Sequence, residues 1–138
     1  MRYVATLSFS LLAALANPAM AAGSACPSTD FPTFLARFAD DPTLQREFVS
    51  DPLQSDSLDT EADPEPKPVS RQLSKAEVSV PLMPTLQEQS DWHLQHHVEI
   101  KGNEAQLTLR GEDSDYLLNL YFRLSDCWRL YRVQDESL

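Results

Sequence analysis

Glycine is scarce in this sequence. Only three glycines occur in 138 residues, at positions 23, 102 and 111, and they are never clustered. Nucleotide-binding loops of the common kinds need clustered glycines, because the main chain must approach the phosphates closely. No serine lies in a Gly-x-Ser-x-Gly turn, the strained elbow that exposes the nucleophile of many serine hydrolases. The sequence therefore offers no support for common nucleotide binding or for serine hydrolase chemistry.

Basic residues are also few. The chain has 11 Lys and Arg residues and 21 Asp and Glu residues, which give a net charge of −10. Without a basic patch, such a chain is repelled by nucleic-acid phosphates and by anionic lipid headgroups. We therefore expect no nucleic acid and no membrane surface as a partner. A length of 138 residues, 42% of them hydrophobic, suits one compact domain.

One long apolar run is present, near the N-terminus. It covers residues 4–16, follows a positive residue and ends before Pro18. A membrane-spanning helix needs roughly 20 uninterrupted apolar residues, so this run is too short to span. A positive start, an apolar stretch and small residues before a cut are typical of a secretory signal peptide. We predict cleavage after Ala21, which removes residues 1–21 and leaves a single periplasmic domain at 22–138.

Cysteine occurs twice, at Cys26 and Cys127. An even cysteine count in an exported protein indicates a disulfide, and a bridge that closes a loop of about 100 residues stabilises by up to about 4.7 kcal/mol in the chain-entropy model. A redox pair would need a Cys-x-x-Cys spacing, which is missing. Lipidation of Cys26 is another alternative, but Gly23 occupies the position where lipoprotein motifs favour Leu. We predict a structural disulfide between Cys26 and Cys127.

Two helices are expected within residues 28–48. The first has one apolar face with helical spacing, formed by Phe31, Phe34, Leu35 and Phe38. Ser28, Thr29 and Asp30 can each cap its first turn, which Pro32 also suits. Asp41 can cap a second, short helix whose inward face holds Leu44 and Phe48. The phenylalanines are therefore predicted core residues.

The hydrophobic period changes to two residues in the second half of the chain, which is typical of strands. Four long strands are expected, at 92–101, 105–110, 116–124 and 128–133. Turns around Gly102 and Gly111 separate the first three. Helices followed by antiparallel strands predict an α+β fold, in which N-terminal helices pack on a curved antiparallel sheet of about four long strands.

Residues 51–68 are acidic and rich in proline. Six acids precede the first base, Lys67, and prolines occupy positions 52, 64, 66 and 68. Few large apolar side chains are present to offset the entropy of ordering the segment, so we predict a mobile loop. A calcium site is the alternative, but the glycine and the closing glutamate of a hand-type calcium loop are missing.

Motifs at both ends of the mature chain resemble a known family. The opening motif is Phe31-x-x-Phe34-Leu35-x-x-Phe38 with Asp41, Leu44-Gln45 and Asp51-Pro52-Leu53, and the closing motif is Tyr121-Phe122-Arg123, Cys127-Trp128-Arg129-Leu130 and Asp135-Glu136-Ser137. They are similar to the ends of small exported bacterial proteins of unknown function. This resemblance implies a cystatin-like fold of the nuclear-transport-factor type. It implies no catalytic residue, and the acidic segment departs from the family pattern.

Three histidines, His93, His96 and His97, lie close together in the sequence, and such a cluster suggests zinc or acid–base chemistry. On a strand, His93 and His97 share a face but lie about 13 Å apart, at about 3.3 Å per residue, so we expect no metal site. His96 falls in phase with Trp92 and can line a pocket with Tyr121 of a neighbouring strand. The alternative is a structural histidine in the core or at the sheet edge.

Aromatic and basic residues gather in the last two predicted strands. Arg123, Arg129 and Tyr131 are candidate interface residues, because exposed aromatic and arginine side chains are typical anchors of protein contacts. The alternative is that the aromatic residues only stabilise the sheet through cross-strand pairs.

The sequence as a whole favours an exported, non-enzymatic binding module with no cofactor and no membrane span. Its expected partner is another exported protein, and an inhibitor or immunity-type role fits an acidic protein that covers a basic cleft. The alternative is a small-molecule-binding or catalytic pocket protein that uses His96.

Overall fold

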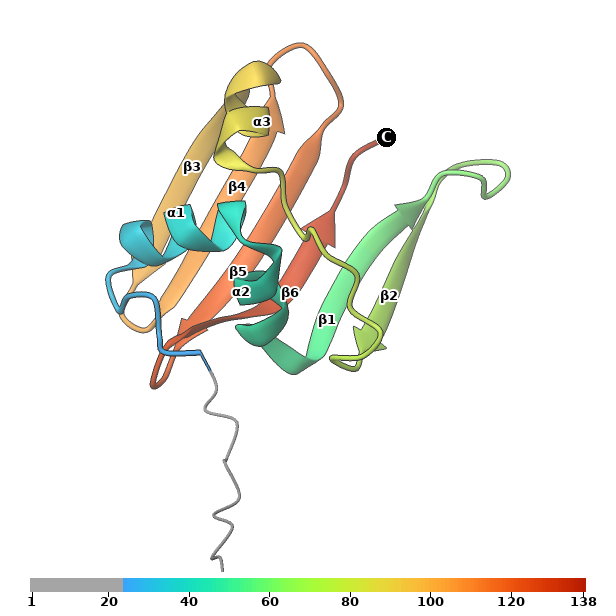
Figure 1. Ribbon diagram of the computed structural model, residues 1–138. Helices are drawn as coiled ribbons and strands as arrows, with labels where there is room; N and C mark the ends of the chain where they lie inside the picture. The colour runs from blue at the N-terminus through green and yellow to red at the C-terminus, as the bar shows by residue number, and fades with distance from the viewer. Residues whose placement is uncertain (1–23) are drawn as a thin grey trace, which may run out of the picture.

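The computed structural model describes residues 24–138. Its elements are, in chain order, α1 (Phe31–Asp40), α2 (Pro42–Glu47), β1 (Val49–Asp59), β2 (Lys67–Leu73), α3 (Leu86–Asp91), β3 (Leu94–Lys101), β4 (Glu104–Gly111), β5 (Leu117–Leu124) and β6 (Trp128–Asp135). The six strands form one sheet in the order β2-β1-β6-β5-β4-β3, and the helices lie on one side of it (Figure 1). Neighbouring strands are antiparallel, except that β1 and β6 are parallel. The predicted α+β class is confirmed, and the predicted signal peptide lies outside the described residues.

Both expected N-terminal helices are present, and side-chain caps define where they begin. The carboxylate of Asp30 accepts a hydrogen bond from the N–H of Thr33 at 3.1 Å. Asp41 accepts from the N–H groups of Thr43 and Leu44 at 2.8 and 3.2 Å. Each cap satisfies main-chain donors that have no partner within the first turn of a helix.

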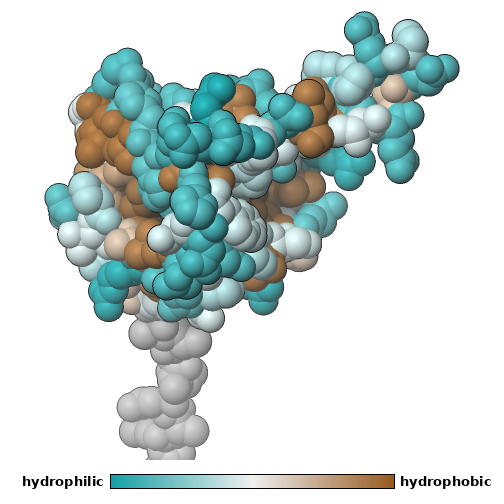
Figure 2. Space-filling model, turned by 90° about the horizontal axis from the view of Figure 1, so that it is seen from above, coloured by the Kyte–Doolittle hydropathy of each residue, from teal (hydrophilic) through white to brown (hydrophobic). Residues whose placement is uncertain are grey.

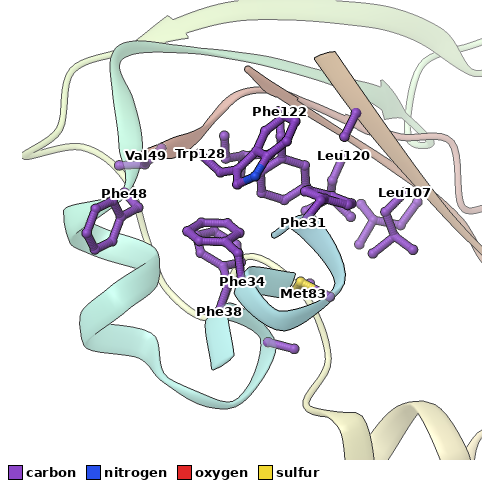
Figure 3. Close-up of a cluster of buried hydrophobic side chains, with 14 of the residues drawn as sticks. Phe31, Phe34, Phe38, Phe48, Val49, Met83, Leu107, Leu120, Phe122 and Trp128 are labelled. Atoms are coloured by element: carbon purple, nitrogen blue, oxygen red, sulfur yellow. The ribbon is translucent and has the colours of Figure 1, made fainter. Parts of the chain in front are cut away.

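The core lies between α1 and the helix side of the sheet (Figure 3). Phe34, Phe38 and Phe122 are completely buried. The ring centroids of Phe34 and Phe38 lie 5.4 Å apart, and Phe38 meets Phe122 edge-on at the same distance. Burial of each large apolar side chain contributes about 1.5–3 kcal/mol, so this aromatic cluster fixes α1 on the sheet. The predicted role of the phenylalanines is confirmed.

The expected number of about four strands is wrong, because β1 and β2 extend the sheet. Residues 51–59 and 67–68, which the composition assigns to a loop, belong to these strands. β1 lies between β2 and β6, so its main chain is paired on both sides, and its Leu53 is buried. Main-chain pairing stabilises this acidic segment where its side chains alone predict disorder. Residues 60–66 form the connection between the two strands.

A third helix precedes the strand expected at 92–101, and the turn that ends this helix takes the place of the first two strand residues. Thr85 and Glu88 form a reciprocal capping box at the beginning of α3. Trp92 is the C-cap of α3, and His93 has a φ of 52° that turns the chain into β3 at Leu94. The alternation that begins at Trp92 in the sequence therefore becomes a strand only at Leu94, because Trp92 and His93 form the turn that ends α3.

A disulfide joins Cys26 to Cys127 with a Cα–Cα distance of 5.5 Å. This is the pair named from the sequence. The indole N–H of the neighbouring Trp128 donates to the carbonyl of Thr29 at 2.8 Å. The two contacts attach the segment before α1 to the beginning of β6.

Candidate functional site

A groove lies between the helix side of the sheet and the segment 81–84, with a volume of about 440 Å³. We call it the central groove. Its lining combines apolar side chains (Leu82, Met83, Leu118 and Val133), aromatic side chains (Trp92 and Tyr116), hydroxyls (Ser55 and Ser57) and acids (Glu88 and Asp135). The strands β1, β5 and β6 form its floor, so the groove depends on β1 being part of the sheet.

The ionisable groups around the central groove are acidic. Glu88 and Asp135 line it, and its lining residues include no Lys, Arg or His. Asp56 also borders the groove, but its carboxylate pairs with Arg132. An unbalanced pair of carboxylates gives the groove a negative potential, which favours a positively charged ligand group.

The phenol of Tyr116 lies close to both of these acids. Burial, followed by the negative charges of Asp135 and Glu88, raises the pKa of Tyr116 to about 12. The hydroxyl therefore stays protonated at neutral pH and can both donate and accept a hydrogen bond. Tyr116 is therefore a neutral polar group in the lining that also holds the two charged acids.

Trp92 and Tyr116 form an aromatic pair at one end of the central groove. Their ring centroids lie 6.3 Å apart in an edge-on arrangement, and Trp92 is 53% exposed. The same two residues line a second hollow of about 340 Å³, which we call the side pocket, together with Leu94, Ser114 and Asp115. An exposed indole that borders two hollows can contact an apolar group or a cation.

The segment that forms one wall of the central groove is held by Gln45 of α2. The buried amide of Gln45 donates to the carbonyl of Phe38 at 3.0 Å, and its side-chain oxygen accepts from the N–H of Leu82 at 2.6 Å. Gln89 of α3 donates to the carbonyl of Pro84 at 2.6 Å. Two buried glutamines thus position the wall from both sides, and the amphipathic pattern of the chain marks neither.

The three candidate pocket residues do not lie together. Trp92 lies at the central groove, whereas His96 lines a separate apolar pocket of about 200 Å³ with Leu35, Leu86 and Val98. Tyr121 points to the other face of the sheet, where its hydroxyl donates to Gln134 at 3.0 Å. These residues line different hollows, because Trp92 ends α3 and Tyr121 faces away from His96 across the sheet.

The face of the sheet opposite the helices brings together two of the three candidate interface residues. The guanidinium carbon of Arg123 lies 4.6 Å from the ring centroid of Tyr131, and Arg123 also pairs with Glu104 at 2.9 Å. Arg129 lies opposite Arg123 in the register but over the ring of Phe48. Tyr121 and Tyr131 border a shallow hollow of about 270 Å³ on this face.

Within residues 24–138, no group of three or more His, Cys, Asp and Glu side chains is placed to hold a metal ion. None of the helices in this range is long and apolar enough to cross a membrane.

Tyr116, Glu88 and Asp135 are groove residues that the sequence analysis did not assign to a site. The Thr85-x-x-Glu88 spacing of a capping box was the available signal for α3. No local signal relates Asp135 to Glu88, because the two residues lie on β6 and α3 and meet only through the sheet order.

A solved structure with a similar arrangement is an NTF2-like protein (NTF2, nuclear transport factor 2) from Bacteroides fragilis NCTC 9343. The match has a TM-score of 0.57 and 21% sequence identity over 79% of this chain. The fold is NTF2-like. The chain spans 47% of the length of that protein, and an identity of 21% carries the fold alone. No protein-family model and no curated protein matches this chain. In this NTF2-like fold, the central groove lies on the sheet side that carries the helices.

Proposed function

We propose that this protein is an exported, non-enzymatic binding protein whose central groove takes an apolar ligand with a positive charge. The observation that carries the proposal is the lining of the groove. Apolar and aromatic side chains predominate there, and the acids Glu88 and Asp135 are not balanced by a basic lining residue. The predicted signal peptide assigns this function to the periplasm.

The chemistry of the groove favours a short peptide segment that combines a basic and an apolar side chain. Leu82 and Leu118 offer apolar surface, which contributes about 25 cal/mol for each Å² buried. The indole of Trp92 can contact a cation, an interaction of about 0.5–2 kcal/mol. Glu88 and Asp135 supply the opposite charge. A segment of another exported protein meets these requirements.

Isothermal titration with two dipeptide amides tests the proposal. Phe-Arg amide carries an apolar and a basic side chain, whereas Phe-Glu amide reverses the side-chain charge. We expect Phe-Arg amide to bind at low ionic strength at least about tenfold more tightly, a difference of about 1.4 kcal/mol. Equal affinity for the two amides would contradict the proposal.

Charge-neutral variants show whether binding occurs in the central groove. Asp135→Asn and Glu88→Gln remove one acid each, and Gln at position 88 preserves the capping box. We expect the combined variant to bind Phe-Arg amide about tenfold more weakly. Glu112→Gln is the matched control, because it removes an exposed acid that lines neither the central groove nor the side pocket.

The alternative function assigns the ligand to His96, which lines the apolar pocket beside Leu107. His96→Ala separates the two possibilities, because His96 is exposed and contributes little to the core. Under our proposal this variant binds Phe-Arg amide as the unmodified protein does. Loss of binding with unchanged thermal stability would favour the His96 pocket.

A protein partner for the arm formed by β1 and β2 is the second candidate function. The end of the arm carries exposed acids at the last residue of β1, Asp59, and in the connection, at Glu61, Asp63 and Glu65. The arm projects from the body (Figures 1 and 2). A projecting acidic hairpin fits the basic cleft of an inhibitor's target. Tagged protein should retain a partner from periplasmic extract at low salt, and Glu61→Lys with Asp63→Lys should abolish retention. Absence of an enriched partner at low salt would contradict this role.

A further inference from the structure

The two edge strands of the sheet differ in their protection against pairing. β2 carries Pro68 and the basic residues Lys67 and Arg71, which are typical of blocked edges. β3 contains no proline, and its one lysine is its last residue. Within the described part of the chain, β3 pairs only with β4. β3 is therefore the edge that can accept another strand.

Apolar side chains are exposed along β3. Val98 and Ile100 are 41% and 49% exposed, and Val98 borders the small apolar pocket that His96 and Leu107 also line. We call this the edge pocket. Figure 2 shows hydrophobic surface on the side of the molecule opposite the arm, which is the side of β3 in Figure 1.

The β3–β4 hairpin determines which main-chain groups of β3 point outward. Lys101 lies opposite Glu104 across a two-residue turn. Residues that flank such a turn exchange hydrogen bonds, and bonded positions then alternate along the strand. His96, Val98 and Ile100 consequently direct their N–H and C=O groups away from β4.

We propose that β3 pairs antiparallel with β3 of a second copy of this chain, about a twofold axis at Val98. In this register Val98 lies opposite Val98 of the second copy, and His96 lies opposite Ile100. The outward main-chain groups of these residues then bond between the copies. Each Ile100 also lies beside the edge pocket of the other copy, where its exposed side chain is covered.

Cross-strand side-chain pairs favour this register over a shift of the axis by one residue to His97. On the other face of the sheet, Glu99 of each copy lies opposite His97 of the other, and Lys101 lies opposite Gln95. An axis at His97 would instead place the two His97 side chains against each other and Glu99 against Gln95. A carboxylate opposite an imidazole is a better cross-strand pair than two imidazoles opposite each other, so the axis at Val98 is preferred over an axis at His97.

Cysteine cross-linking tests the register directly. The axis at Val98 places two Val98 Cα atoms about 5.5 Å apart, within the range of about 4.4–6.8 Å that a disulfide needs. Val98→Cys should therefore give a covalent dimer under mild oxidation. His97→Cys is the control, because its two copies are offset along the strands and should stay uncross-linked. Cross-linking of His97→Cys without Val98→Cys would overturn the proposed axis.

Sedimentation of the purified protein tests the association itself. We expect a concentration-dependent dimer that Val98→Lys converts to a monomer, while Val69→Lys on the other edge strand leaves it dimeric. Glu99→Lys should weaken the dimer about tenfold, and adding His97→Glu should restore it. Circular dichroism checks that each variant folds. A monomer at millimolar concentration would overturn the proposal.

Discussion

The guanidinium of Arg132 lies 2.6 Å from the carboxylate of Asp56, joining β6 to β1 beside their parallel pairing. Asp56 also accepts hydrogen bonds from Ser70 of β2 at 2.5 Å and from Gln54 at 2.8 Å. One carboxylate therefore ties three neighbouring strands together. This contact attaches the acidic segment to the body of the sheet.

Replacement of Asp56 by Asn should lower the free energy of unfolding and make that free energy less dependent on pH in the acidic range. Burial opposes ionisation, but hydrogen bonds from Ser70, Gln54 and Arg132 outweigh it and lower the pKa of Asp56. Since the folded pKa lies below the unfolded value of about 3.9, the stabilisation is present above about pH 4 and is lost as pH falls through the folded pKa. We expect a loss of about 1–3 kcal/mol at neutral pH.

Urea unfolding of the Asp56 variant at neutral pH and near pH 3 measures both effects. Asp63→Asn is the matched control, because Asp63 is exposed in the connection between β1 and β2. Equal stability of the Asp56 variant and this control at neutral pH would contradict the prediction.

Gln45→Leu should loosen the wall of the central groove. The change leaves the Leu82 N–H without its acceptor and the Phe38 carbonyl without a donor, at a cost of about 1–3 kcal/mol. Hydrogen exchange at Leu82 should become faster, and Phe-Arg amide should bind more weakly. Gln87→Leu on the exposed side of α3 is the control. Unchanged exchange at Leu82 would show that Gln45 does not hold this wall.

Phe34→Ala should be among the most destabilising substitutions in the core. Phe34 is fully buried among Phe38, Phe48 and Phe122, and removal of such a ring costs about 3–5 kcal/mol.

Trp92→Ala removes an aromatic side chain that is 53% exposed. It should cost less than about 1 kcal/mol of stability but weaken binding in the central groove by about 0.5–2 kcal/mol, which is roughly 2- to 30-fold. Thermal unfolding of both variants checks the contrast.

Replacement of both Cys26 and Cys127 by Ser should reduce the free energy of unfolding by about 2–4 kcal/mol. The disulfide links residues separated by 101 positions, so its loss frees a long segment of the unfolded chain. Urea unfolding measures the change, and intact mass after alkylation without reductant verifies the bond. Alkylation of both thiols in the unreduced, unfolded protein would contradict the assignment.

The helices near the start of the chain follow directly from local sequence. Asp30 and Asp41 satisfy helix N–H groups only a few residues away, and the spacing of Phe34 and Phe38 defines the buried face. The hairpin of β3 and β4 is equally local, because Gly102 adopts the positive φ of 61° that the turn needs. Interactions over such short sequence distances are visible in the sequence.

Other features depended on residues that are distant in the chain. The local sequence of residues 51–59 does not show that this segment pairs with β6. Parallel pairing joins β1 and β6, which are separated by most of the domain. The sequence predicts Trp92 on a strand for a different reason: the two-residue alternation continues through Trp92 and His93, where the structure has the turn that ends α3. For residues 51–59, composition alone predicts a loop, because it does not include the main-chain pairing with β2 and β6.

The sequence by itself determined the helix caps, the aromatic core face, the cysteine pair and the acidic character of the protein, because each depends on residue type or on short spacing. Only the tertiary structure decided the central groove and the free edge at β3. Glu88, Tyr116 and Asp135 line one groove because β5 pairs with β6 and α3 lies over the same side of the sheet. A strand becomes an edge only through the order of all six strands, and that order is a property of the assembled sheet.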